Sequence, residues 1–216
     1  KDIGLIELTN PSEVLISEKP KDVSGSVIIS TVEGTRPMLL ELQALVSPTS
    51  FGIAKRTATG VDYNRVAVLE AVLEKRVGLQ IQNQDVYINV VGGIKVNEPS
   101  MDLGIILSVA SSFRNLPIDG DVVVTGEVGL TGEIRAVSYI EKRIAECKKM
   151  GFKKIVIPKN NYAAVKDTKG IEIIPVDNLR QAINLVLRGW WIGMYNMDNI
   201  MDNKNLLHAL RKISPG

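Results

Sequence analysis

A serine at the start of a predicted helix is the residue of this sequence best suited to chemistry. Ser100 follows Pro99 and precedes an apolar run, residues 103–110, whose large side chains recur with the spacing of one helix face. The first backbone N–H groups of a helix are unpaired and its dipole favours negative charge, so a nucleophilic hydroxyl beside an oxyanion site fits this position. A plain N-cap, in which the serine side chain only accepts a backbone N–H, fits it equally.

The sequence offers few partners for such a nucleophile. His208 is the single histidine and lies in the C-terminal tail, so a Ser-His-Asp triad is not available to the domain. Cys147 is the single cysteine, which excludes an internal disulfide and a cysteine-built zinc site. Because Cys147 falls on the apolar side of a predicted helix, we expect it to be a small buried residue.

The pattern of hydrophobic residues predicts the elements that position the serine. In the first half we expect strands at 25–32 and 38–46, a polar loop at 47–60, a helix at 63–76, a strand at 86–90 and, after the Gly92-Gly93 turn, a short strand at 94–96. In the second half we expect strands at 122–125, 155–158 and 171–175, and helices at 139–150 and 178–187. A hairpin-rich half followed by alternating strands and helices indicates an α+β domain with mixed sheets and packed helices.

Composition and charge restrict the class of protein and the kinds of partner that we expect. With 216 residues, 45% of them hydrophobic and 23% charged, the chain is long enough for one sizeable core or two small ones. No apolar run approaches the ~20 residues that cross a bilayer, and no signal peptide opens the chain, so we expect a cytoplasmic location without membrane contact. The net charge of +2 does not by itself indicate a nucleic-acid partner.

Changes in local composition and hydrophobic pattern divide the chain into three parts. Residues 1–24 read as a connector entering the domain, 25–188 as the domain, and 189–216 as a linker or tail, with a possible following domain starting there. Because the chain begins at Lys1 without an initiator methionine, we expect it to be a fragment of a longer protein.

Several segments within roughly residues 1–187 together resemble the C-terminal Lon-protease-like domain of the bacterial RadA (Sms) family of DNA-repair and recombination proteins. They are Glu33-Gly34-Thr35-Arg36-Pro37, Glu41 to Val46, Asn64-Arg65, Asp85 to Gly93, Lys95-Val96, Asp102-Leu103 and Gly126 to Leu130. The resemblance implies a Lon proteolytic-domain-like fold of the ribosomal-protein domain 2-like superfamily. It also implies a hexameric ring, contact with single-stranded or branched DNA, a recombinase of the RecA type as partner, and branch migration driven by ATP.

The cofactors of that family belong to modules that this sequence does not contain. The resemblance places ATP with Mg in a RecA-like ATPase and Zn in a zinc finger, both N-terminal to the Lon-like domain. A Gly-x-x-x-x-Gly-Lys-Ser/Thr phosphate loop does not occur in this sequence, so we expect no cofactor in this chain.

The same resemblance makes Ser100 the position of the Lon nucleophile, whose base in Lon is a lysine. Counting from the Thr125 to Val128 block places that lysine at Glu141, and Lys142 follows one residue later, about 100° further around a helix. We therefore expect a vestigial serine, acting as a helix N-cap, and no catalytic residue. The alternative is an active Lon-type Ser-Lys peptidase that uses Lys142.

Basic residues in the first half of the domain are the candidates for contact with DNA phosphates. They are Lys55, Arg56, Arg65, Lys75, Arg76 and Lys95. Pairs such as Lys142-Arg143 and Lys148-Lys149 form a second group, of which Lys148 and Lys149 are expected to lie outside the DNA-contacting face. Aromatic residues make up only 5% of the chain, so we expect contacts to the backbone and not to the bases.

Two further interpretations remain open. The domain could be an oligomerisation module that never contacts DNA. The tail from Met201 weakly resembles the start of a DNA-integrity-scanning diadenylate cyclase, which would make it the opening of a second domain.

Overall fold

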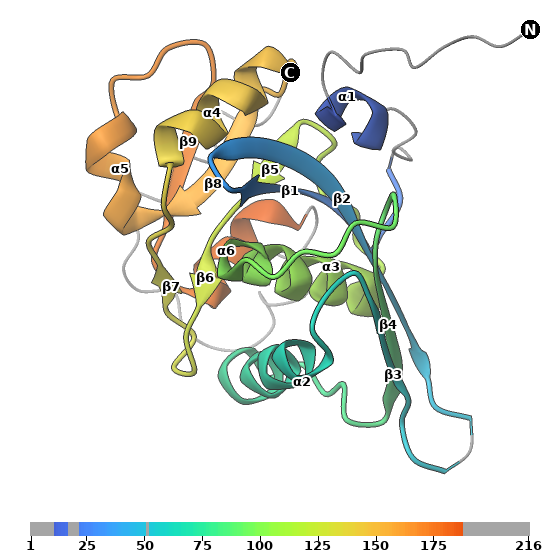
Figure 1. The fold of residues 1–216 in the computed structure, drawn as a ribbon. Coiled ribbons are helices and arrows are strands. Elements are labelled where there is room, and N and C mark those ends of the chain that lie inside the picture. The colour runs from blue at the N-terminus through green and yellow to red at the C-terminus, as the bar shows by residue number, and fades with distance from the viewer. Residues whose placement is uncertain (1–10, 17–21, 51, 188–216) are drawn as a thin grey trace, which may run out of the picture.

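The computed structural model describes residues 11–16, 22–50 and 52–187 (Figure 1). The first ten residues of the expected connector and the whole of the expected tail, 189–216, lie outside the described residues. None of the described helices is long and apolar enough to cross a membrane.

A seven-stranded sheet with the order β3-β4-β2-β1-β5-β8-β9 forms the centre of the described structure. Its strands are β1 (Ser26–Glu33), β2 (Arg36–Pro48), β3 (Arg56–Thr59), β4 (Gln84–Val90), β5 (Val122–Val124), β8 (Lys154–Pro158) and β9 (Glu172–Val176). β2 pairs antiparallel with β1 and β4, and the other neighbours pair in parallel. A two-stranded ribbon of β6 (Glu127–Val128) and β7 (Ile134–Arg135) stands beside it. The predicted mixed sheet is confirmed.

Helices pack on both faces of this sheet (Figure 1). They are α1 (Pro11–Ile16), α2 (Tyr63–Val72), η1 (Leu73–Val77), η2 (Pro99–Met101), α3 (Asp102–Arg114), α4 (Ile140–Lys149), α5 (Lys159–Val165) and α6 (Leu179–Val186). The apolar sides of α2, α3 and α6 share one hydrophobic core with the sheet, and those of α4 and α5 share a second core with its other face. α1 lies in the segment that we expected to be a connector, but its buried Ser12 accepts a hydrogen bond from the Leu39 N–H of β2.

Two of the predicted elements need correction. Residues 94–96 form no strand. Gly92 and Gly93 both adopt positive φ, and in this segment only the Val96 N–H donates a backbone hydrogen bond, to the Gly60 carbonyl of the adjacent segment. The expected loop at 47–60 contains β3, whose threonines point to solvent and so give the strand a polar sequence. α5 has no counterpart among the predicted elements.

α3 is the central buried helix of the described structure. Its residues from Asp102 to Ser111 are all buried, because sheet, ribbon and helices surround it. Gly104 permits the close approach to β1: a Cβ atom at this position would lie 2.2 Å from Cγ2 of Ile29.

The variant Gly104→Ala is therefore expected to lower the free energy of unfolding by about 1–3 kcal/mol, since overpacking outweighs the helix propensity of alanine. Gly120→Ala is the control, because Gly120 is exposed and an added Cβ meets nothing within 4 Å. Urea unfolding of both variants measures the difference, and equal stabilities would contradict the close packing of α3 on β1.

Candidate functional site

Ser100 lies in the short 3-10 turn η2 that leads into α3, and its hydroxyl is buried. The side chain is 2% exposed, and its Oγ donates to the Ser30 carbonyl of β1 over 3.4 Å. The predicted N-cap role is wrong: the cap positions of η2 and α3 fall on Glu98 and Met101. The physical reason is that the 3-10 turn begins at Pro99, so Ser100 stands inside the first turn and not before it.

Arg143 of α4 is the side chain next to this hydroxyl. Its Nη1 donates to Ser100 Oγ over 3.3 Å and to the Ser30 carbonyl over 2.7 Å. Its Nε donates to the Ser138 carbonyl over 2.9 Å, and its Nη2 forms an ion pair with Glu98. The arginine side chain is 0% exposed, so a full positive charge is held inside the protein.

Glu98 supplies the compensating negative charge. Besides Arg143 it accepts hydrogen bonds from Thr31 Oγ1 over 2.8 Å and from the Val32 N–H over 2.7 Å. Burial by itself raises the pKa of the Glu98 carboxyl, but the hydrogen bonds that it accepts, first the one from Arg143, lower that pKa by more. The net pKa lies below its ordinary value, so the carboxylate is ionised at neutral pH.

Among the described residues, no side chain that can take a proton contacts Ser100 Oγ. An arginine guanidinium is not deprotonated in proteins, so it cannot take a proton from Ser100 Oγ. Lys142, the alternative base, is exposed; its Nζ donates to the Thr35 carbonyl over 3.3 Å and lies 5.0 Å from the centre of the Tyr139 ring. Glu141, at the expected lysine position, is exposed on the first turn of α4.

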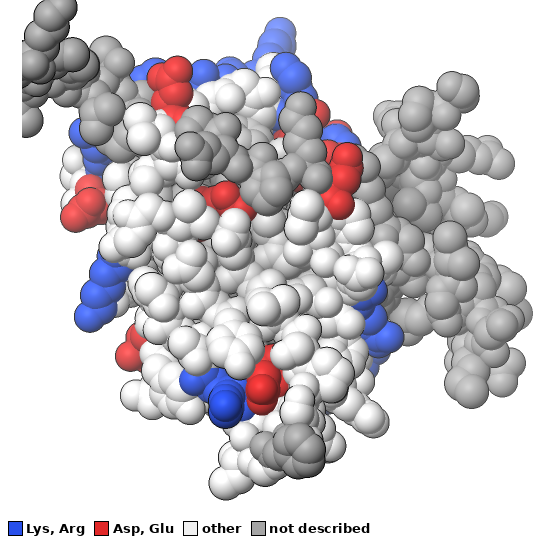
Figure 2. Space-filling model, turned by 90° about the vertical axis from the view of Figure 1, so that its right-hand side faces the viewer, with Lys and Arg blue, Asp and Glu red and all other residues white. Residues whose placement is uncertain are grey.

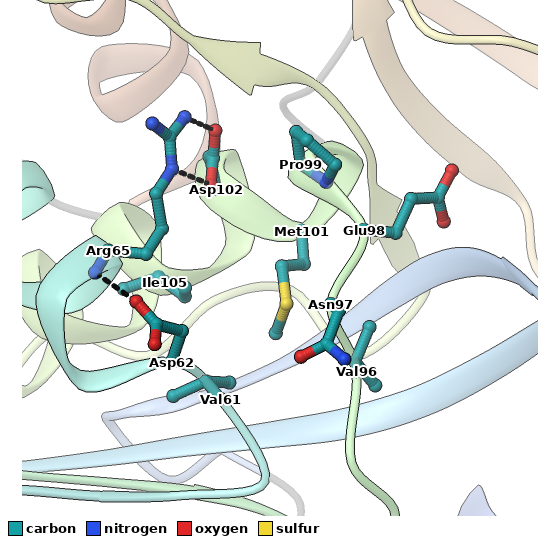
Figure 3. Close-up of a pocket in the computed structure, with 10 residues that line it drawn as sticks. All are labelled: Val61, Asp62, Arg65, Val96, Asn97, Glu98, Pro99, Met101, Asp102 and Ile105. Atoms are coloured by element: carbon teal, nitrogen blue, oxygen red, sulfur yellow. Dashed lines mark hydrogen bonds and ion pairs between the residues drawn. The ribbon is translucent and has the colours of Figure 1, made fainter.

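A small cavity adjoins the 3-10 turn on another side (Figure 3). Its volume is about 160 Å³, and Pro99 and Met101, the two neighbours of Ser100, contribute to its wall. The remaining lining residues are Val61, Asp62, Arg65, Val96, Asn97, Glu98, Asp102 and Ile105. Since Ser100 Oγ faces the Ser30 carbonyl, a side chain bound in this cavity would not meet the hydroxyl.

The polar rim of the cavity is formed by the ion pair of Arg65 with Asp102 (Figure 3). Arg65 Nε donates to Asp102 Oδ1 over 2.8 Å, and the Val128 N–H donates to Asp102 Oδ2 over 3.0 Å. The hydrogen bond to Asp102 raises the pKa of the Arg65 guanidinium. Asp102 is 0% exposed, so Arg65 serves to fix α2 on α3 and β6.

The six predicted DNA-contacting residues divide into two kinds. Arg56, like Arg65, is engaged inside the chain: it pairs with Glu70 and donates to the carbonyls of Gln84, over 2.6 Å, and Ile81, over 3.1 Å. The side chains of Lys55, Lys75, Arg76 and Lys95 are exposed. Only these four of the six are exposed residues.

Arg143 is the site residue that sequence reasoning missed, because it was grouped with Lys142 as part of a basic surface pair. The signal was present in the sequence. Ile140, Arg143, Ile144 and Cys147 stand at i, i+3, i+4 and i+7, and all four are buried on one face of α4. Burial also raises the pKa of the Cys147 thiol to about 12, which agrees with its predicted role as a small buried residue.

No group of three or more histidine, cysteine or acidic residues in the described ranges is arranged to hold a metal ion. The site thus consists of a buried serine, a buried arginine and their hydrogen-bond partners.

A family model places the chain in a class of protein domains. The model described as subunit ChlI of Mg-chelatase matches residues 47–161, more than half of the chain, and the chain belongs to this family. The matched range contains Ser100, Glu98, Arg143 and the Arg65–Asp102 pair.

Individual relatives are more specific. The chain is 52% identical over 189 residues to the DNA repair protein RadA of Bacillus subtilis, 51% over 187 residues to that of Listeria monocytogenes, and 48% over 183 residues to that of Streptococcus pneumoniae. The alignments cover 88%, 87% and 85% of this chain, but only 41%, 41% and 44% of these relatives. The chain therefore spans less than half of the length of the proteins that it matches.

Peptide hydrolysis is expected to stay at background in this chain, because no described side chain that contacts Ser100 Oγ can accept its proton. The measurement compares cleavage of a fluorogenic peptide library by the unmodified chain, Ser100→Ala and Lys142→Ala. All three should give the rate of a blank. Cleavage by the unmodified chain that Ser100→Ala abolishes would contradict the assignment.

The variant Glu98→Gln is expected to lower the free energy of unfolding at pH 7 by about 3 kcal/mol, because the buried Arg143 loses its counter-charge. Since the folded-state pKa of Glu98 is lowered, its contribution is complete above the unfolded-state pKa of about 4.3 and is lost as pH falls through the folded-state value. The gap between the unmodified chain and the variant should therefore narrow below about pH 4.

Urea unfolding at pH 7, 5 and 3.5 measures this gap. Glu172→Gln, on the exposed side of β9, is the matched control and should show little difference at any pH. A gap for Glu98→Gln that stays constant between pH 7 and 3.5 would refute the ion pair.

Proposed function

We propose that this chain is a non-proteolytic Lon-like domain that acts as a scaffold and DNA-contacting platform in DNA repair and recombination. The observation that carries this proposal is the buried Arg143, which lies where a proton acceptor would have to stand beside Ser100. A protease-like site whose described residues supply no base to the serine is suited to binding and assembly.

The names of the relatives support the biological setting. Proteins called DNA repair protein RadA align with most of this chain at about half identity. We infer that the chain is part of a longer RadA-type protein, an ATP-driven branch-migration helicase in the cytoplasm that works with a recombinase of the RecA type. The module that binds ATP and Mg would lie in another part of that protein, because this sequence has no phosphate loop. The module that binds Zn would also lie elsewhere, because this sequence has a single cysteine.

One face of the domain is suited to assembly into a ring, which we infer to be hexameric. The outward side chains at the middle of β2, β4 and β3 on this face are uncharged: Gln43, Leu45, Thr57, Thr59, Tyr87 and Asn89. Asp85, at the start of β4, is the charged residue at the edge of the same face. Figure 2 looks at the side on which β3 and β4 lie, and the centre of that face carries no Lys, Arg, Asp or Glu. Depletion of charge is typical of surfaces buried between protein subunits and unsuitable for DNA, so we assign this face to a second copy of the chain.

The exposed cations are suited to DNA. Lys55 directly precedes β3, and Lys95 lies in the segment whose Val96 N–H bonds to the Gly60 carbonyl just after β3. The two lysines therefore stand near opposite ends of the same edge strand. We assign them to backbone phosphates, which attract lysine without regard to sequence.

The test is fluorescence anisotropy with labelled single-stranded and branched DNA over a series of salt concentrations. The double variant Lys55→Ala/Lys95→Ala is expected to bind more weakly, and the slope of log K against log salt should fall by about 1 for each phosphate that is no longer neutralised. Lys148→Ala/Lys149→Ala removes the same charge from the exposed end of α4 and is the control.

Equal losses of affinity for the two double variants would reject the assigned lysines. If the unmodified chain fails to bind DNA at low salt but sediments as an oligomer, the alternative function, an oligomerisation module without DNA contact, replaces the proposal.

A further inference from the structure

Two arginines from distant parts of the sequence meet on the surface below α2. Arg76 belongs to η1, the π-helical continuation of α2, and Arg180 to the first turn of α6. Arg180 Nε donates to the Arg76 carbonyl over 2.9 Å, and Arg76 Nε donates over 3.1 Å to the Leu130 carbonyl in the turn between β6 and β7. Both side chains are exposed, and Lys75, which precedes Arg76 in η1, is exposed as well.

The acidic side chains nearby in sequence do not neutralise this cluster. No ion pair among the described residues includes Lys75, Arg76 or Arg180. Glu127 and Glu133 lie within 4 Å of Arg135, and one carboxylate oxygen of Glu74 is buried. Two arginines that the packing brings together, with Lys75 next to Arg76 in sequence, thus have no carboxylate partner in the described part of the chain.

The geometry of the two guanidinium groups orders them for an incoming anion. Each arginine uses its Nε to bind a backbone carbonyl, and within residues 11–16, 22–50 and 52–187 no further hydrogen bond engages the terminal nitrogens of either group. The side chains are thereby positioned before any ligand binds, which lowers the entropy cost of binding. Paired terminal N–H groups of arginine match the oxygens of a phosphate.

We propose that Arg76 and Arg180, with Lys75, form a phosphate-binding site for the backbone of a nucleic-acid strand. This inference rests on the proposed contact with DNA and adds Arg180, which the sequence did not single out, to the residues that bind it. The cluster is exposed, so a long polyanion reaches it without a conformational change. Its neighbour in the β6–β7 turn, Leu130, is 68% exposed. Because an aliphatic side chain neither stacks on a base nor forms hydrogen bonds with it, the contact is to phosphates and independent of base sequence.

The experiment compares DNA binding by the unmodified chain and by Arg76→Gln/Arg180→Gln, using a labelled single-stranded oligonucleotide. The double variant should bind on the order of tenfold more weakly near 0.1 M salt, and its salt slope should be smaller by about 2. Lys148→Gln/Lys149→Gln is the charge-matched control and should change binding much less. Arg76→Lys/Arg180→Lys keeps the charge and should retain most of the salt slope.

Circular dichroism melting identifies any loss of folding, in which case the lysine double variant and the single variant Lys75→Gln decide the question. A glutamine double variant that is folded and binds like the control would overturn this site while leaving the proposed function intact. DNA binding absent in the unmodified chain would overturn both.

Inorganic phosphate, added at constant ionic strength, separates the two sources of the anion. Competition only at concentrations far above those of the oligonucleotide supports a strand-binding site. Displacement of DNA by low millimolar phosphate, abolished in the glutamine double variant, would overturn the assignment in favour of a small-anion site.

Discussion

The burial of one positive charge is the constraint on which the rest of this structure depends. Taking a guanidinium out of water costs several kcal/mol, so it has to be offset by an anion and by acceptors in fixed places. Arg143 finds them on three different segments: the Ser30 carbonyl of β1, the Ser138 carbonyl before α4, and Glu98 before η2. Any shift of α4 against β1 or the start of α3 would leave part of that charge unpaired, so the ion pair fixes their relative positions.

The same network surrounds Ser100 with groups that do not accept a proton from it. Ser100 has a carbonyl oxygen on one side and a permanent cation on the other, so its oxygen accepts and its proton is held without being removed. The cavity beside η2 is lined by the neighbours of Ser100 and ends at the Arg65–Asp102 pair, which itself joins α2 to α3. Charges that could have served chemistry are used to hold elements together.

Arginine and lysine divide this work according to their chemistry. Arg56, Arg65 and Arg143 each satisfy several acceptors through a planar fork, which allows them to lie partly or wholly inside the protein. Lys55 and Lys95 carry compact, strongly hydrated charges and stay on the surface, close to a sheet edge. The interior arginines hold elements of the domain together, and the surface lysines carry the charge that we propose for contact with DNA.

The sequence by itself determined the elements whose periodicity is strong: the hairpin of β1 and β2, helices α2, α4 and α6, and the inward position of Cys147. It also placed Ser100 at the entry to α3. It did not decide what that serine touches, because Ser30 and Arg143 lie 70 and 43 positions away in the chain. Nor did it separate buried arginines from exposed ones, or bring Arg180 beside Arg76, 104 positions apart. Local spacing determines which face of an element is apolar, whereas the partners of a charge depend on which distant segments the packing brings within hydrogen-bond reach.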